Sequence, residues 1–215
     1  MIKKGSKKII SQKYIIGIDE VGRGSLAGPV VVVAAMIPAG FKIKNSSLGT
    51  MFDSKKLSAT KRESWNQYLK NHPQIKFALA RISPAIIDRI NISRSANRAA
   101  LRAYQKLTSS FKHLPSNLNV FLDGGLYLGN GKNKIPAKTV IKGDEKIESI
   151  MIASIIAKVY RDKLMRRLSW KIPGYSFEIH KGYGTKVHLR AIKKLGPSPA
   201  HRLTFLGFSK FRAKR

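Results

Sequence analysis

The feature that most constrains the fold is an unbroken apolar run, Val30–Ile37, which opens with four valines. A short run rich in β-branched residues is typical of a strand buried inside a sheet. A second apolar run, Ile150–Ala157, lies in a segment with helical spacing. Both runs are far too short to cross a bilayer, which takes roughly 20 residues. We therefore predict a soluble, cytoplasmic chain that has a buried sheet and no membrane contact.

Further strands and helices are predicted on both sides of this run. The expected strands are 14–18, 75–82, 119–122 and 139–141; the expected helices are 59–71, 93–108, 145–168 and 185–195, with a short helix opening at Ser83-Pro84. Because strands come first and then alternate with helices, we predict an α/β fold with a mixed sheet and helices on both faces. We divide the chain into a basic N-terminal extension (1–13), a sheet domain (14–170) and a C-terminal segment (171–215) packed on that domain.

The charge balance is extreme, because 42 Lys and Arg stand against 11 Asp and Glu and leave a formal net charge of +31. A chain this basic attracts polyanions, and phosphate contacts release counterions, so we expect salt-dependent binding of nucleic acid. A general basic bias is one alternative. A membrane-surface role is another, but it needs a basic amphipathic helix, and none is convincing. No cysteine is present, which excludes disulfides and thiolate metal sites.

Four acids follow short apolar runs, each with a glycine within two residues: Asp19, Glu20, Asp123 and Asp144. Side chains at the ends of neighbouring strands can converge on one edge of an α/β sheet. Mg²⁺ prefers carboxylate oxygen, and two such ions about 4 Å apart activate water and stabilise a leaving oxygen. Taken singly, Asp123 and Asp144 also suit a turn or a helix cap. We predict that the four acids form one divalent-metal site, although spacing alone leaves the turn interpretation open.

Longer blocks of the sequence resemble a known family. The stretch YIIGIDEVGRGSLAGPV (14–30) is similar to the opening signature of ribonuclease HII, and DSKKLS (53–58) is similar to its second motif. The blocks FLDG (121–124), KGD (142–144) and ASIIAKVYRD (153–162) follow in family order. HKGYGTKVH (180–188) and PAHRLTF (199–205) complete a resemblance that covers nearly the whole chain.

The resemblance implies an RNase H-like fold with a mixed five-stranded sheet. It implies an endoribonuclease that hydrolyses RNA in RNA–DNA hybrids and incises duplex DNA at embedded ribonucleotides. It assigns two Mg²⁺ or Mn²⁺ ions to Asp19, Glu20, Asp123 and Asp144. The sibling family, ribonuclease HIII, carries an extra N-terminal domain and a glutamate at the fourth acidic position. With 13 residues before its first strand and an aspartate at 144, this chain better resembles ribonuclease HII.

The resemblance also assigns contacts to the substrate. Gly22, Arg23 and Gly24 are expected at the ribonucleotide and its phosphate, since glycine allows close backbone approach and arginine can fork onto phosphate. Tyr183 is expected to recognise the ribose–deoxyribose junction, where the 2′-hydroxyl is the general handle. Judged without the family, a plain tight turn at Gly22–Gly24 and a tyrosine folded back on the core explain these positions about as well.

Other cations within the motif blocks are candidate phosphate contacts: Lys55, Lys56, Lys142, Lys181, Lys186 and Arg202. Each lysine taken alone also suits a solvated surface. The C-terminal segment is expected to contribute to substrate binding. The histidines at 180, 188 and 201 lack zinc spacing, so we interpret them as groups that order loops. We interpret Asp162 as structural, either paired with Arg161 or Arg166 on its helix or capping a neighbour.

Two segments depart from the family pattern: the glycine-rich stretch 124–132 and the polar helix start 91–97. Neither includes a predicted metal ligand. We expect a monomer, and the sequence leaves open whether the basic tail contacts a partner such as a replication clamp. The alternative function is a non-catalytic, basic nucleic-acid-binding protein. The acids argue against it, because carboxylates that face phosphates weaken binding unless metal intervenes.

Overall fold

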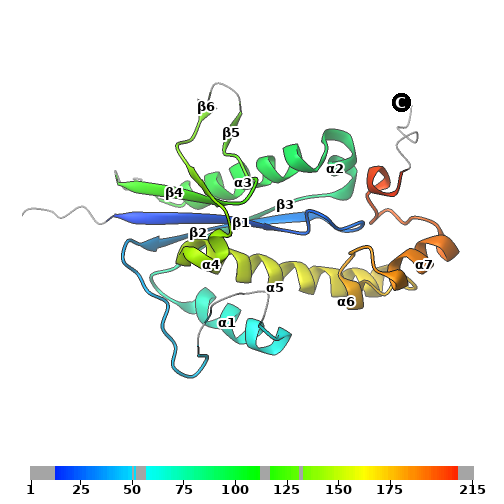
Figure 1. Ribbon diagram of the computed structural model, residues 1–215, viewed down its shortest axis with the longest axis horizontal. Helices are drawn as coiled ribbons and strands as arrows, with labels where there is room; N and C mark the ends of the chain where they lie inside the picture. The colour runs from blue at the N-terminus through cyan, green and yellow to red at the C-terminus, as the bar shows by residue number, and fades with distance from the viewer. Residues whose placement is uncertain (1–12, 50, 52–56, 112–116, 131–132, 208–215) are drawn as a thin grey trace, which may run out of the picture.

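The computed structural model describes residues 13–49, 51, 57–111, 117–130 and 133–207. Its centre is a five-stranded sheet with the strand order β3-β2-β1-β4-β7 (Figure 1). These strands are β1 (Tyr14–Val21), β2 (Val30–Pro38), β3 (Lys76–Ile82), β4 (Leu118–Asp123) and β7 (Lys138–Val140). β1 pairs antiparallel with β2 and parallel with β4, so the prediction of a mixed sheet is confirmed.

Helices cover both faces of the sheet (Figure 1). α2 (Pro84–Ile90) and α3 (Ile92–Thr108) lie on one face, while α1 (Ala59–Asn71) and α5 (Glu148–Lys171) lie on the other. The short helices α4 (Gly143–Lys146) and α6 (Phe177–His180) adjoin α5, and α7 (Lys186–Leu195) and the 3₁₀ helix η1 (Leu203–Leu206) follow. No helix in the described ranges is long and apolar enough to span a membrane.

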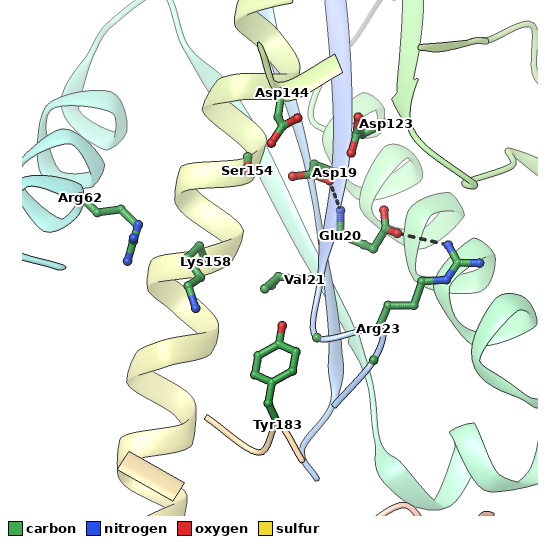
Figure 2. A pocket seen from close by; sticks show the side chains of 12 residues that line it. Asp19, Glu20, Val21, Arg23, Arg62, Asp123, Asp144, Ser154, Lys158 and Tyr183 are labelled. Carbon is green, nitrogen blue, oxygen red and sulfur yellow. Dashed lines mark hydrogen bonds and ion pairs between the residues drawn. The ribbon is translucent and has the colours of Figure 1, made fainter. Parts of the chain in front are cut away.

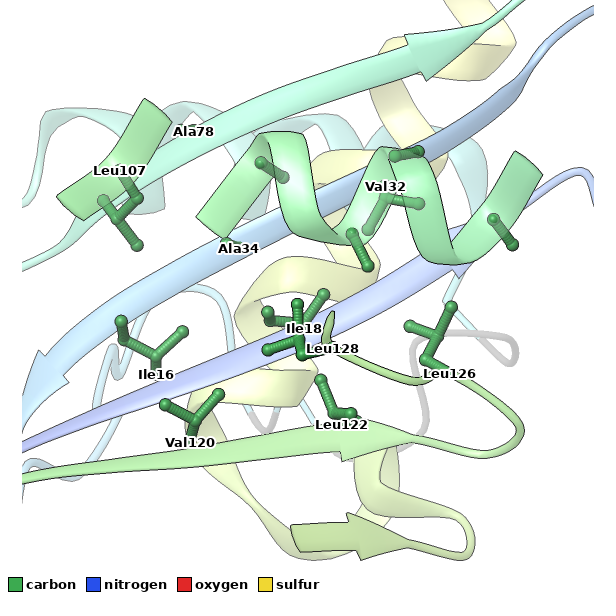
Figure 3. Packing of buried hydrophobic residues seen from close by; sticks show 14 of the residues in the cluster. Ile16, Ile18, Val32, Ala34, Ala78, Leu107, Val120, Leu122, Leu126 and Leu128 are labelled. Atoms are coloured by element: carbon green, nitrogen blue, oxygen red, sulfur yellow. The ribbon is translucent and has the colours of Figure 1, made fainter. Parts of the chain in front are cut away.

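β2 explains why the central run is apolar throughout. Val32, Ala34 and Met36 pack in the cluster beneath α3, whereas Val33 and Ala35 pack in the cluster with α1 and α5. Successive side chains of a strand point to opposite faces, so a strand covered on both faces is apolar at every position. Figure 3 shows the α3 side of the sheet, where residues of β1, β2 and β4 form one layer.

Gly17 in β1 lets the start of α5 lie directly against the sheet. A Cβ atom at Gly17 would overlap the backbone of Ser149 and Ile150 in the first turn of the helix. A glycine is therefore required here by close backbone approach. The contact places the helix beside Asp19, two residues further along β1.

The structure corrects two details of the predicted elements. The helix predicted for 145–168 is wrong at its start: α4 ends at Lys146, Ile147 is extended (φ −126°, ψ 116°), and α5 begins at Glu148. The acids 19, 20 and 123 lie within the last residues of their strands and not after them. A small hairpin of β5 (Gly129–Asn130) and β6 (Asn133–Lys134) was not predicted within the glycine-rich departure.

A third apolar cluster joins the C-terminal segment to the rest of the chain. It contains Ala27 from the loop after β1, Met165 of α5, and Tyr175, Phe177 and Ala200 from the C-terminal segment. Burial of these side chains holds the C-terminal segment against the loop that follows the first two acids. The division at residue 170 stays a prediction.

Candidate active site

The four predicted acids line one pocket of about 430 Å³ (Figure 2). Asp19 and Glu20 come from the end of β1, Asp123 from the end of β4, and Asp144 from α4. β1 and β4 are parallel neighbours, so their C-terminal ends meet at one edge of the sheet. We call this side of the pocket the acid wall.

A hydrogen bond from a backbone N–H to the Asp123 side chain links the segments that carry the two more distant acids, Asp123 and Asp144. The Asp123 carboxylate accepts the N–H of Gly143 at 2.7 Å, one residue before Asp144. Lys142, just before this turn, has a left-handed backbone (φ 55°), which directs the chain from β7 into α4. The side chain of one acid thereby fixes the turn that places the next, and Asp144 is left 2% exposed.

Two residues of the acid wall, Asp19 and Glu20, have raised pKa values. Burial raises the pKa of Asp19 well above its usual range, and the carboxylates of Glu20 and Asp123 raise it further, while the Ser154 hydroxyl opposes the shift. Burial also raises the pKa of Glu20, although its ion pair with Arg23 (Oε1–Nη1 3.2 Å) works in the opposite direction. A bound cation would remove this penalty.

The donor set suits a hard divalent cation, because every candidate ligand offers carboxylate oxygen. Glu20 Oε2 is buried and has no hydrogen-bond partner in the part of the chain that the structure describes. Within the same part, no three Asp, Glu or His side chains already surround one point at ion-binding distance. An ion held by three of these carboxylates at once would therefore require them to draw together, whereas Mg²⁺ held by one or two of them and by water would not.

The opposite side of the pocket is lined by Gly22–Gly24 and Tyr183. We call the loop 22–29 together with the segment around Tyr183 the loop wall. Two arginines with 0% exposure hold its carbonyls from behind. Arg202 donates to Gly22 O at 2.6 Å, to Arg23 O at 2.8 Å and to Gly28 O at 2.9 Å. The predicted phosphate contact at Arg202 is therefore wrong, because its buried guanidinium donates its hydrogen bonds to the loop carbonyls.

Arg161 is the second buried arginine of the loop wall. It donates to Ser25 Oγ at 2.8 Å, Ala27 O at 3.1 Å and Pro29 O at 3.2 Å. Gly22 has φ +85°, and a Cβ there would overlap the Arg161 guanidinium. Burial lowers the pKa of both arginines, that of Arg202 to about 9, which still leaves it charged at neutral pH.

The substrate residues that the resemblance assigns, Gly22–Gly24 and Tyr183, all line this pocket. Of the candidate phosphate contacts, Lys142, Lys181 and Lys186 do not line it, and Lys55 and Lys56 lie outside the described residues. The Arg23 side chain is held by Glu20 and donates to Ser93 Oγ at 3.3 Å. Tyr183 is 37% exposed, and its hydroxyl end points into the pocket toward Val21 (Figure 2). The alternative of a tyrosine folded back on the core does not describe this side chain.

Four pocket residues were not predicted: the apolar Val21 and the polar Arg62, Ser154 and Lys158. Asp162 organises two of them, since its carboxylate contacts Lys158 Nζ at 2.9 Å and Arg62 Nη1 at 3.9 Å. Its predicted pairing with Arg161 or Arg166 is wrong. The spacing of four residues from Ser154 to Lys158 to Asp162 puts these groups on one helix face, which is a signal that was present in the sequence.

A mixed sheet that presents four acids at one edge, opposite a glycine-rich loop and a tyrosine, defines a metal-dependent nuclease of the RNase H-like class. Comparison with known proteins agrees, because residues 16–208 match the family model of Ribonuclease HII. The chain belongs to the ribonuclease HII family. It is accordingly a hydrolase, a metal-dependent endoribonuclease of the ribonuclease H type.

Individual relatives show how far the similarity extends. Ribonuclease HII of Chlamydia pneumoniae is 41% identical over 201 residues, which cover 93% of this chain and 87% of the relative. Ribonuclease HII of Bacillus mycoides is 45% identical over 192 residues, which cover 89% and 68%. The solved ribonuclease H2 from Pyrococcus horikoshii OT3 has a TM-score of 0.65 at 25% identity, over 92% of this chain and 96% of that one. Bst-RNase HIII in complex with Mn²⁺ has a TM-score of 0.69 at 21% identity, over 94% and 70%, and shows the shared fold alone.

Proposed function

We propose that this chain hydrolyses the RNA strand of RNA–DNA hybrids and also incises duplex DNA at embedded ribonucleotides, with two divalent cations at Asp19, Glu20, Asp123 and Asp144. Activity on hybrids follows from the family; the second substrate and the two-ion site are the proposal. The observation that carries it is the convergence of acids from β1, β4 and α4 on a pocket whose other side holds Gly22–Gly24 and Tyr183.

The acid wall supplies the ligands. When bound there, Mg²⁺ or Mn²⁺ activates the attacking water and stabilises the leaving oxygen. Asp19 and Glu20 are adjacent on a strand, so their side chains leave β1 in opposite directions and approach the pocket from different sides. The bond from Gly143 keeps Asp123 oriented toward the acid wall.

The loop wall and the cations next to it position the substrate. Because Arg202 and Arg161 occupy the loop carbonyls, the shape of Gly22–Gly24 is fixed before a substrate arrives. Tyr183 presents a ring and a hydroxyl, which suit stacking under a sugar and a bond to its 2′-hydroxyl. Lys158 and Arg62 place positive charge where backbone phosphates would enter.

A cleavage assay with three matched duplexes tests the proposal: all DNA, an RNA–DNA hybrid, and DNA with one ribonucleotide. We expect cleavage of the second and third with Mg²⁺ or Mn²⁺, none of the first, and none of any with chelator. Cleavage of the hybrid alone would refute incision at embedded ribonucleotides. Chelator-insensitive binding without cleavage of any duplex would instead favour the non-catalytic alternative.

Three accompanying predictions stay open: a cytoplasmic location, a monomeric state and a clamp contact through the basic tail. Residues 208–215 of that tail lie outside the described residues. Gel filtration with light scattering tests the monomer, and titration of the chain with a purified sliding clamp tests the contact.

A further inference from the structure

Three histidines meet outside the pocket, directly behind Tyr183. His180 ends α6, His188 lies in the first turn of α7, and His201 lies just before η1. Their exposed fractions are 7%, 0% and 2%. The rings of His180 and His188 stack with their centroids 4.1 Å apart, and those of His188 and His201 are 5.1 Å apart. Phe177 packs edge-on against His188 at 5.5 Å, so the cluster is enclosed by aromatic side chains.

Every ring nitrogen in this cluster has a hydrogen-bond partner. His201 Nδ1 lies 2.9 Å from Ser198 N, His201 Nε2 lies 3.0 Å from His188 Nε2, and His188 Nδ1 lies 2.9 Å from Tyr183 O. His180 contacts Gly182 N at 3.1 Å and Tyr175 O at 2.7 Å through its two nitrogens. No nitrogen of the three rings is left to ligate a metal, so their role must lie in the bonds themselves.

The partners determine where each proton sits. The Ser198 N–H donates to His201 Nδ1, so the His201 proton is on Nε2 and is donated to His188 Nε2. His188 then carries its proton on Nδ1 and donates it to the Tyr183 carbonyl. This assignment follows from the bonding pattern, and it describes a directed chain from the Ser198 backbone to the Tyr183 backbone.

This directed series of hydrogen bonds requires a neutral His188 ring. A second proton on His188 would point an N–H at the N–H of His201. A second proton on His201 Nδ1 would displace the bond from the Ser198 N–H and turn to Ser198 Oγ, which lies 2.8 Å from this nitrogen. Burial keeps the rings neutral: it lowers the pKa of His188 to about 4, and it also lowers the pKa of His180 and of His201. The charged groups around the cluster and its segment are Glu178, Lys181, Arg202, and, from α5, Lys158, Arg161, Asp162 and Arg166.

The series of hydrogen bonds ends at the segment 182–183, which forms part of the loop wall. The Tyr183 carbonyl accepts from His188 and from Thr185 N at 2.8 Å, and the Tyr183 ring lies 5.5 Å from the Arg161 guanidinium. The neighbouring Gly182 carbonyl accepts from Leu26 N at 2.8 Å and from Ala27 N at 3.2 Å. The backbone of residues 182–183 is thus fixed from the histidines on one side and from the loop after Gly24 on the other.

We propose that His201 and His188 are positioning residues for Tyr183: a relay of two neutral imidazoles sets the backbone from which the tyrosine ring reaches into the pocket, and so sets the preference for a ribonucleotide. The inference rests on the proposed function, because it takes Tyr183 as the group that meets the sugar. His180 supports the relay by stacking on His188.

A double-mutant cycle with Tyr183 tests this assignment. On DNA with one ribonucleotide, we expect His188→Ala to lower kcat about tenfold, since one buried bond and its partner are lost. His188→Asn keeps a donor near Tyr183 O and should recover part of that loss. In a Tyr183→Ala background, His188→Ala should have less than about a twofold further effect, because the histidine acts through the tyrosine. An undiminished tenfold loss in that background overturns the proposal.

His72→Ala is the matched control. This histidine packs against Phe41 and Tyr68, away from the pocket, and its loss should leave the cycle unchanged. If His188 variants fail to fold, imidazole ¹⁵N spectra of the wild-type chain decide the matter. We expect the proton of His188 on Nδ1 and that of His201 on Nε2, with the His188 ring neutral down to pH 5. The opposite tautomer of His188, or its protonation above pH 6, overturns the relay.

The same spectra separate this inference from the proposed function. If the wild-type chain cleaves no ribonucleotide-containing duplex, the proposed function fails and the spectra still decide whether the relay exists. If cleavage occurs and the cycle is additive, the inference fails and the proposed function stands.

Discussion

The two walls of the pocket satisfy their polar groups in opposite ways. On the acid wall, burial and mutual repulsion raise the pKa of Asp19, and Glu20 Oε2 has no partner within the described ranges. On the loop wall, Arg161 and Arg202 are buried and form no ion pair with another described residue, although Asp162 and Asp88 attract them from farther away. Their donors reach loop carbonyls and a hydroxyl. The acid wall therefore keeps buried carboxylates incompletely paired, which costs stability, whereas carbonyls of the loop wall are hydrogen-bonded to the two arginines. We therefore expect substitutions in the acid wall to lower activity more than stability, and substitutions in the loop wall to lower stability more than metal binding.

The largest expected effect is on activity, from the acid wall. Asp123→Asn keeps an oxygen for the Gly143 N–H but removes a negative ligand. Because bound metal contributes several kcal/mol to the transition state, we expect the cleavage rate to fall at least about 10³-fold. The melting temperature should stay equal or rise, since one repelling charge is gone. Glu63→Gln, an acid paired with Lys163 outside the pocket, is the control for both readouts, and near-normal cleavage by Asp123→Asn would contradict the assignment.

The loop wall should respond in the reverse way. Arg202→Met leaves the carbonyls of Gly22, Arg23 and Gly28 buried without their donor. We expect the free energy of unfolding to fall by about 3 kcal/mol, while Mn²⁺ binding to the folded protein is retained. Urea unfolding and Mn²⁺ titration measure the two quantities. Arg89→Met, at an exposed position of α2, should change the free energy of unfolding little. An equal loss in both variants would contradict a stabilising role that is specific to the buried Arg202.

The histidines give the loop wall a pH dependence of known sign. The pKa of His188 is about 4 in the folded chain and about 6.5 when unfolded. Only the unfolded chain therefore takes up the proton as pH falls between these values. The stability present above pH 6.5 is lost toward pH 4, by up to about 3 kcal/mol. Urea unfolding of wild type and His188→Gln at pH 7 and pH 4.5 isolates this contribution. An equal change in the free energy of unfolding between the two pH values for both proteins would be inconsistent with a neutral His188.

The smallest effect is expected where the two walls meet. Lys158 faces the pocket but is held by Asp162. Lys158→Met should weaken binding of a ribonucleotide duplex a few-fold and lower the slope of log affinity against log salt by about one. Lys76→Met, at an exposed position of β3, is the matched control. Fluorescence anisotropy over a salt series measures both variants, and equal slopes would remove Lys158 from the interface.

Much of the acid wall could be predicted from the sequence, because apolar runs ending in acids show where the strands end. The break at Ile147 could not. No glycine or proline marks it, and α5 continues the same apolar pattern, so tertiary packing at Asp123 and Gly143 must decide it. Local propensity is a weak guide where such contacts compete with it.

The loop wall was harder to predict, although its glycines were recognised. Arg161 and Arg202 are two of 42 basic residues, and nothing in their neighbourhood in the sequence separates a buried guanidinium from an exposed one. Their burial depends on carbonyls that only the folded loop presents. The three histidines were interpreted as loop-ordering groups, but the direction of their hydrogen bonds depends on which segments meet in space.

The central claim is that acids from three separate segments hold cations together. Counting tightly bound Mn²⁺ by electron paramagnetic resonance, with a non-cleavable ribonucleotide duplex present, tests it most directly. We predict two ions per wild-type chain and fewer for each of Asp19→Asn, Glu20→Gln, Asp123→Asn and Asp144→Asn, with Glu63→Gln unchanged. Two tightly bound ions in all four pocket variants would contradict the account.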